Sequence, residues 1–395
     1  MAGTAHRAVS FGRGLALGAS DVRRIWDKLF AAFERAPGVP DDLVLVGFVA
    51  GTAKRDIDAA HSLLDAIAFH PVMRARLPRF QVVVTSDERG LARLETSLTS
   101  GATPAYAYRC LAYGRFSDAI PPARLSSIVL KIAGLPDGFS VAAEILHMRL
   151  FADINPKREH APELLHCGRS LFKLCDLKGY DQSLDHNLAE LVKFCLKDSG
   201  AADEVRAVCE ALFRDGDSGA WIWHAYDQLV QALFETRPYE CLDIFFGSGD
   251  PQRLGPVMML RPLRNSGFDA LPQAIVLDWA QRDPTVRFPI VAMGLRPMKG
   301  TEEATPPEWS DAALGVLAAA PDRLAVLEAF ATQFVPSSWS GSRAVIMENR
   351  RALLAQFLQS VDPREAAWAQ AEDSRLSIQA ERERLQEQQF NQTFE

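Results

Sequence analysis

The chain of 395 residues lacks any hydrophobic run long enough to cross a bilayer. Its longest apolar stretch, residues 43–50, falls far short of the roughly 20 residues that a membrane-spanning helix needs. The first twenty residues contain Arg7 and Arg13, which interrupt the hydrophobic core that a secretory signal requires. We therefore expect a cytoplasmic protein that makes no contact with membranes.

Positively charged residues are fewer than negatively charged ones. The chain has 43 Lys and Arg and 50 Asp and Glu, which gives a net charge of −7. This balance argues against a general nucleic-acid-binding protein, although it leaves room for a local basic surface. The six cysteines form no Cys-x-x-Cys pair and stand mostly inside apolar stretches. Cysteine in such places usually behaves as a small buried side chain, so we expect no disulfide framework.

Motifs that carry chemistry are scarce. Residues 215–219, Asp-Gly-Asp-Ser-Gly, contain the string that surrounds a serine-protease nucleophile, but they separate two predicted helices and suit a turn. Residues 47–54 superficially resemble a phosphate-binding loop but lack its order of residues and a preceding strand. Histidines and cysteines gather between residues 166 and 209 without the paired spacing of a zinc site. We therefore expect no cofactor, no metal and no enzymatic activity.

The chain does contain one amphipathic segment after another. In residues 21–35, Val22, Trp26 and Phe33 fall on one helical stripe, with Ser20 as the expected N-cap. Further helices are predicted at about 40–49, 56–69, 87–99, 104–113, 121–133, 138–151, 162–175, 184–197, 201–214, 219–234, 238–246, 251–263, 269–281, 284–293, 307–319, 322–334, 342–360 and 363–390. Only residues 80–84 are predicted as a strand.

Short connections between amphipathic helices favour antiparallel helical hairpins, and helix pairs recur here at roughly 35–45 residues. We therefore predict an all-α fold, an irregular α-solenoid of stacked antiparallel helix pairs, HEAT-like or TPR-like. Polar breaks divide it into an N-terminal helical-repeat segment 1–153, a central segment 162–295 and a C-terminal segment 306–395. The last of these ends in a highly charged helix.

The stretch 251–299 is a candidate binding surface because it is locally basic. It holds seven Lys or Arg against three Asp, a surplus of four positive charges, with aromatic residues between them. Arginines beside aromatic rings suit an acidic partner or nucleic acid, whereas the plainer interpretation is a solvated face over core aromatics. The arginines that we assign to this surface are Arg261, Arg264, Arg282 and Arg287.

A second candidate surface is formed by Trp339 and Arg343. These residues precede a predicted helix for which Ser340 or Ser342 would be the N-cap. An exposed Trp and Arg are typical of contact sites between proteins, whereas the alternative interpretation is a packed structural corner.

Five segments carry a resemblance to a known class of proteins. They are Phe11-Gly-Arg-Gly-Leu-Ala-Leu-Gly18 with Trp26, Arg89-Gly-Leu-Ala-Arg-Leu94, Leu111-Ala-Tyr-Gly-Arg115, residues 135–148, and Ser338-Ser-Trp-Ser-Gly-Ser-Arg343. With them the chain resembles the C-terminal helical-repeat region of bacterial NACHT-type and other STAND-like multidomain ATPases associated with defence. That resemblance implies a partner-binding sensor or scaffold. Such proteins usually carry an effector and a nucleotide-binding domain before the repeats, and this sequence shows neither. The resemblance therefore implies either a fragment or a separate subunit whose partner is the effector or nucleotide-binding subunit.

Three hypotheses about function follow. The leading one is a non-enzymatic helical-repeat protein that binds a protein partner as a sensor or scaffold in bacterial, antiphage-type defence. The second is nucleic-acid recognition through the basic surface in residues 251–299. The third is an all-α enzyme whose site is assembled from residues distant in sequence, such as Glu144, His147 and His186.

Overall fold

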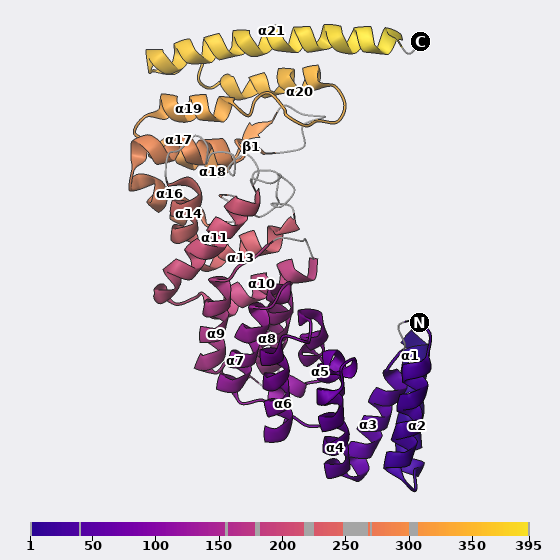
Figure 1. Ribbon diagram of the computed structural model, residues 1–395. Coiled ribbons are helices and arrows are strands. Elements are labelled where there is room, and N and C mark those ends of the chain that lie inside the picture. Colours follow the sequence, from indigo (N-terminus) through magenta and orange to yellow (C-terminus); the bar gives the residue numbers. More distant parts are fainter. Residues whose placement is uncertain are drawn as a thin grey trace. The chain divides into compact units, whose positions relative to one another are not determined.

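The computed structural model, shown in Figure 1, describes residues 2–38, 41–154, 157–177, 182–216, 225–247, 268, 271–299 and 307–393. These residues form an all-α fold, which confirms the predicted class. In the described ranges the strands amount to one antiparallel pair of two-residue segments, β1 (Met298–Lys299) and β2 (Glu308–Trp309). The chain divides into two compact units, Met1–Val208 (unit 1) and Cys209–Glu395 (unit 2).

Unit 1 is built from consecutive helices, each of which packs against neighbours close in sequence. Its elements are α1 (Ala2–Gly18), α2 (Val22–Arg35), α3 (Leu43–Arg55), α4 (Ile57–Phe69), the 3₁₀ helix η1 (Met73–Arg76), α5 (Leu77–Gln81), α6 (Glu88–Ser100), η2 (Ala105–Ala112), η3 (Phe116–Ala119), α7 (Pro122–Ala133), α8 (Gly138–Ile154), α9 (Pro162–Phe172), α10 (Gln182–Cys195), η4 (Ser199–Ala201) and α11 (Ala202–Gly216), within which the boundary between the units falls.

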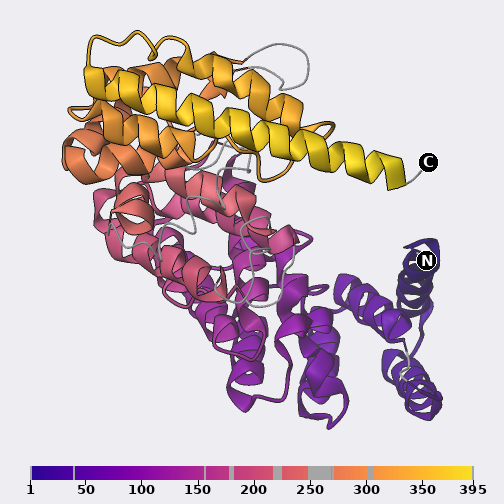
Figure 2. The same cartoon turned by 90° about the horizontal axis from the view of Figure 1, so that it is seen from above.

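Unit 2 is also built from consecutive helices that pack against neighbours close in sequence. Besides β1 and β2 it contains α13 (Asp227–Thr236), α14 (Pro238–Phe246), α16 (Gln273–Gln281), α17 (Pro284–Gly294), α18 (Asp311–Ala319), α19 (Arg323–Ala331), α20 (Arg343–Arg350), η7 (Arg351–Leu354) and α21 (Pro363–Thr393). Within this unit α21 lies alongside α20, as Figures 1 and 2 show. None of the helices in the described ranges combines the length and the apolar character of a membrane-spanning segment.

Several predictions about single elements were wrong. Residues 80–84 are not a strand, because Phe80 belongs to α5 and packs into the core one turn after Leu77. The helix predicted at 40–49 begins at Leu43 and continues to Arg55. The first helix of the prediction is capped by Asp21 instead of Ser20, since the Asp21 carboxylate accepts a hydrogen bond from the Arg24 amide at 2.9 Å. Helix α1 had no counterpart in the prediction.

The stretch that superficially resembles a phosphate-binding loop is the interior of α3, which packs tightly against α1. A Cβ atom added to Gly47 would lie 2.1 Å from the carbonyl oxygen of Val9. A Cβ added to Gly12 on α1 would lie 2.0 Å from the carbonyl oxygen of Val44. The two glycines therefore allow the backbones of α1 and α3 to approach each other closely.

Candidate partner-binding site

Unit 1 contains a hollow of about 540 Å³ that opens to solvent. It lies between the start of α3, the segment η1–α5 and the 3₁₀ helix η2. The residues that line it are Asp41, Asp42, Ala75, Arg76, Arg79, Tyr106, Ala107 and Cys110. The hollow therefore combines charged side chains with short apolar ones.

The helix η2 places its residues on three faces because a 3₁₀ helix has three residues per turn. Ala105, Tyr108 and Leu111 form the buried face. Ala107 and Cys110 are partly buried and line the hollow. The third face is exposed and carries Tyr106, whose side chain is 75% accessible, and Arg109. One short element thus supplies both the wall of the hollow and the exposed residues beside it.

Asp42 anchors the charged side of the hollow. Its side chain is only 2% exposed, yet it lies 3.1 Å from Nη1 of Arg76 and 2.7 Å from Nη1 of Arg79. A buried carboxylate needs such compensation, because taking an unpaired charge out of water is costly. The guanidinium of Arg76 also lies 5.3 Å from the centre of the Phe33 ring. Asp42 therefore pairs with two guanidinium groups at the wall of the hollow, with Arg76 through a hydrogen bond and with Arg79 through an ion pair that lacks hydrogen-bond geometry.

Exposed polar groups continue along η2 away from the hollow. Nε of Arg109 lies 2.9 Å from the carboxylate of Glu144 on α8, and the Tyr113 hydroxyl donates a hydrogen bond to the same carboxylate. Tyr113 is itself exposed. Burial raises the pKa of the Cys110 thiol to about 12, so this cysteine stays protonated at neutral pH and is a poor nucleophile.

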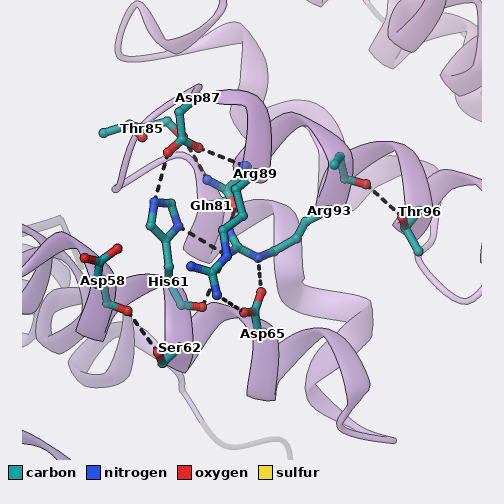
Figure 3. A network of polar contacts seen from close by, with 12 residues as sticks. Asp58, His61, Ser62, Asp65, Gln81, Thr85, Asp87, Arg89, Arg93 and Thr96 are labelled. Atoms are coloured by element: carbon teal, nitrogen blue, oxygen red, sulfur yellow. Dashed lines mark hydrogen bonds and ion pairs between the residues drawn. The ribbon is translucent and has the colours of Figure 1, made fainter.

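A buried polar network holds the helix that carries Arg79 (Figure 3). Nε2 of His61 on α4 lies 2.9 Å from the carboxylate of Asp87, and Nδ1 lies 3.1 Å from Nη2 of Arg93 on α6. Because arginine can only donate, Nδ1 must accept, so the proton of the neutral ring is on Nε2 and is donated to Asp87. Nη1 of Arg93 donates to Gln81 of α5 at 3.1 Å. The network therefore ties α5 to α4 and α6.

Asp65 completes this network at the side of α4. It accepts a hydrogen bond from Nε of Arg93 at 2.5 Å and a second one from Arg89. Burial acts to raise the pKa of Asp65, but the bonds from the two arginines outweigh it and lower the pKa below its ordinary value. The segment Arg89-Gly-Leu-Ala-Arg-Leu94, one of those that carry the resemblance, thus contributes two arginines to this network of hydrogen bonds.

Of the three residues that the sequence suggested for an enzymatic site, His147 and His186 are in contact, whereas Glu144 pairs with other residues. The rings of His147 on α8 and His186 on α10 meet edge to face with their centres 5.4 Å apart. His147 is buried, and neither of its ring nitrogens makes a well-aligned hydrogen bond, although the Asn187 amide lies near. Glu144 is engaged with Arg109 and Tyr113 instead. The enzymatic alternative stays a prediction.

In unit 2, two of the arginines predicted to bind a partner already have partners within the chain. Arg282 lies 2.9 Å from Asp278 and 4.3 Å from the centre of the Tyr239 ring. Arg287 lies 3.0 Å from Asp243 and 4.5 Å from the centre of the Trp279 ring. The other two, Arg261 and Arg264, lie outside the described residues. Nucleic-acid binding by this stretch stays a prediction.

Trp339 and Arg343 lie together, with the guanidinium 4.5 Å from the centre of the ring. Arg343 also forms an ion pair of 2.7 Å with Glu383 on α21. Ser342, one of the two residues predicted as the N-cap, caps α20. Its hydroxyl accepts a hydrogen bond from the Val345 amide at 3.2 Å. This corner therefore helps to dock α21, while Trp339 remains half-exposed.

The cysteines are free, and five of the six are buried, as the sequence indicated. Burial raises the pKa of both Cys167 and Cys195 to about 12. In the part of the chain that the structure describes, no group of three or more His, Cys, Asp or Glu is placed to hold a metal ion. The Ser218 of the protease-like string lies outside that part.

Comparison with known proteins adds no relative: no family model, curated protein or solved structure matches this chain. The hollow and the exposed face of η2 were missed by the sequence interpretation. A three-residue period in residues 105–111 was the available signal, with Tyr106 and Arg109 one 3₁₀ turn apart. The buried anchor Asp42 follows another acidic residue and gave no comparable signal.

Proposed function

We propose that the protein is a non-enzymatic helical-repeat protein and that a protein partner docks on the exposed face of η2 in unit 1. The observation that carries the proposal is the solvent-exposed Tyr106 beside a hollow lined by Arg79, with Arg109, which pairs with Glu144, on the same exposed face. Tyrosine and arginine are enriched among the residues that dominate binding energy at protein interfaces. Next to a hollow they can anchor a partner while its side chains fill the space.

The proposal includes an irregular solenoid architecture. It is supported by contacts between helices close in sequence, such as those among α7, α8 and α9 in unit 1 and those among α17, α18 and α19 in unit 2. Repeat proteins of this kind commonly act by binding other proteins along extended surfaces. The assignment to a bacterial defence sensor or scaffold, and the cytoplasmic location, stay predictions, the first of which rests on the resemblance.

The test is capture of the partner by the purified chain from its native host, followed by titration of the identified partner. Tyr106→Ala should weaken the complex by about 2 kcal/mol, roughly thirtyfold, as expected for an interface anchor. The matched control is Phe390→Ala, which removes a comparably exposed aromatic ring from α21 in unit 2. Equal weakening by both changes, no weakening by Tyr106→Ala, the absence of a stoichiometric partner, or capture that nuclease abolishes would each contradict the proposal.

A further inference from the structure

The hollow beside η2 has the size and lining of a ligand subsite. Its volume of about 540 Å³ lies within the roughly 300–1,000 Å³ typical of sites that enclose small groups. Ala75 and Ala107 have short side chains, and together with Cys110 they leave an apolar wall. The ring of Tyr106 stands at its edge. An occupant therefore needs an apolar stem that can lie against these residues.

Arg79 supplies the polar end of the hollow. One of its nitrogens, Nη1, lies 2.7 Å from Asp42, and its side chain is 47% exposed. Its other nitrogens have no hydrogen-bond partner among the described residues, although a guanidinium has five N–H donors in a planar fork. The ion pair with Oδ1 of Asp42, which lacks hydrogen-bond geometry, keeps the guanidinium at this end of the hollow before any ligand arrives, and this lowers the entropic cost of binding.

The charge of the lining selects the kind of anion. The positive charges of Arg76 and Arg79 are balanced by Asp42 and by Asp41, whose Oδ1 accepts a hydrogen bond from the Leu43 amide at 3.0 Å. A phosphate with two charges would meet a lining without surplus positive charge and would be repelled by Asp41. A singly charged carboxylate is repelled less by Asp41 than such a phosphate is, and its two oxygens match the planar fork of one arginine in geometry.

We propose that the hollow binds the side-chain carboxylate of a glutamate or aspartate of the partner, with Arg79 as the residue that recognises it. This inference rests on the proposed function and names the chemistry that the partner presents. Asp42 acts as a positioning residue for Arg79. The apolar stem of the acidic side chain, or the apolar residue next to it, packs against Ala107 and the ring of Tyr106.

The test uses two blocked peptides, acetyl-Ala-Leu-Glu-Leu-Ala-amide and its counterpart with Gln in place of Glu, titrated onto the full chain by saturation-transfer NMR. The Glu peptide should bind at least about tenfold more tightly, the equivalent of about 1.4 kcal/mol, because hydrogen bonds to charged groups are the stronger ones. The preference should disappear in Arg79→Gln. It should persist in the control Arg115→Ala, which removes another exposed arginine of unit 1 that pairs only with Asp118.

A second variant keeps the test valid if Arg79→Gln loses its fold. Ala107→Leu fills the hollow without touching the pairs of Asp42, and it should abolish binding of the Glu peptide. Undetectable or equal binding of the two peptides, a preference that survives Arg79→Gln in a folded protein, or inorganic phosphate displacing the Glu peptide better than acetate does would each overturn the inference.

The two proposals can fail separately. If Tyr106→Ala weakens the partner complex while the Glu and Gln peptides bind alike, the proposed docking surface stands and the proposed recognition of a carboxylate fails. If the Glu peptide binds through Arg79 while Tyr106→Ala leaves the partner complex unchanged, the hollow is a carboxylate site and the docking surface lies elsewhere.

Discussion

Arg351 on η7 donates two hydrogen bonds to the carboxylate of Asp373 on α21, from Nε at 2.8 Å and from Nη2 at 2.9 Å. This paired geometry is the strongest arrangement available to the two side chains. Farther along α21, Glu383 pairs with Arg343, and Glu387 accepts hydrogen bonds from the Ser342 hydroxyl and the Ala344 amide at the start of α20. A helix with few apolar residues is thus fastened by charged contacts along its length.

The first prediction concerns this fastening. Arg351→Ala should weaken the docking of α21 by about 1 kcal/mol, because the pair is partly exposed and solvent screening reduces its contribution. Hydrogen exchange of the α21 amides should become faster accordingly. Arg351→Lys, which keeps the charge but loses the fork, should be intermediate. Arg384→Ala is the control, because Arg384 pairs with Glu381 within α21 itself and both are exposed. Unchanged exchange in Arg351→Ala would show that the pair with Asp373 does not contribute to the docking of α21.

A second prediction concerns the approach of α1 to α3. Gly47→Ala would place a methyl group 2.1 Å from the Val9 carbonyl oxygen, and such overpacking costs about 1–3 kcal/mol or more. The matched control is Gly14→Ala, in the C-terminal part of α1, where an added Cβ would meet nothing within 4 Å. That change should stabilise the helix by about 0.5–1 kcal/mol. Thermal unfolding of the two variants should therefore shift in opposite directions, and a shift in the same direction would contradict the packing described here.

The existence of most helices could be predicted because their apolar residues recur at intervals of three and four. Their ends were less certain, as the cap at Asp21 shows, because Ser20 and Asp21 are both good N-cap residues and only the local backbone decides between them. The prediction of a strand at residues 80–84 was wrong for another reason. A short apolar run fits a buried helix and a strand equally well, and in this chain Phe80 packs beside Leu77.

The candidate site could not be predicted in the same way, because the residues that line it come from separate elements. Asp42 precedes α3, Arg79 belongs to α5 and Cys110 to η2, and no spacing in the sequence indicates that they meet. The residues chosen from the sequence include arginines beside aromatics, and their binding of a partner stays a prediction. Arg287 lies over Trp279 and pairs with Asp243, so a composition that suits a ligand is here an internal contact.

A third prediction follows from the lowered pKa of Asp65. A carboxyl group with a pKa below its value in the unfolded chain, 3.8, binds its proton more weakly when folded. Its contribution to stability is therefore complete above that value and is lost as the pH falls through the lowered pKa. Asp65→Asn should reduce the free energy of unfolding at pH 7 by about 1 kcal/mol, since the carboxylate is partly exposed. It should also flatten the acid limb of the stability curve.

The control for that prediction is Asp27→Asn, because Asp27 pairs with Arg23 on the exposed side of α2 with both side chains more than half accessible. Urea unfolding measured between pH 7 and pH 2, with a probe in unit 1, distinguishes the two. If Asp65→Asn and Asp27→Asn gave the same acid limb, the bonds from Arg93 and Arg89 would not be what stabilises the ionised carboxylate.

The last prediction concerns His147. Burial lowers the pKa of His147, and the neighbouring His186 lowers it further. In the unfolded chain the ring takes up a proton near pH 6.5, so below that value the unfolded state binds more protons than the folded state does. The stabilising contribution of the neutral ring is complete above pH 6.5 and is lost as the pH falls through the lowered pKa. The nearby Asn187 amide, then Glu190 on α10 and Glu144 on α8, act in the opposite direction and limit the effect.

Unit 1 should therefore unfold more readily at acidic than at neutral pH, and His147→Phe should reduce that difference, because a ring of similar shape replaces the titrating one. His70→Phe is the control, since His70 is partly exposed and lies 3.3 Å from Glu34 instead of against another histidine. Proton NMR of the histidine rings provides the direct measurement, with the His147 signal expected to titrate below pH 6.5. A His147 ring that titrated at or above that value would contradict the buried, unpaired environment, and so would an unchanged pH dependence in His147→Phe.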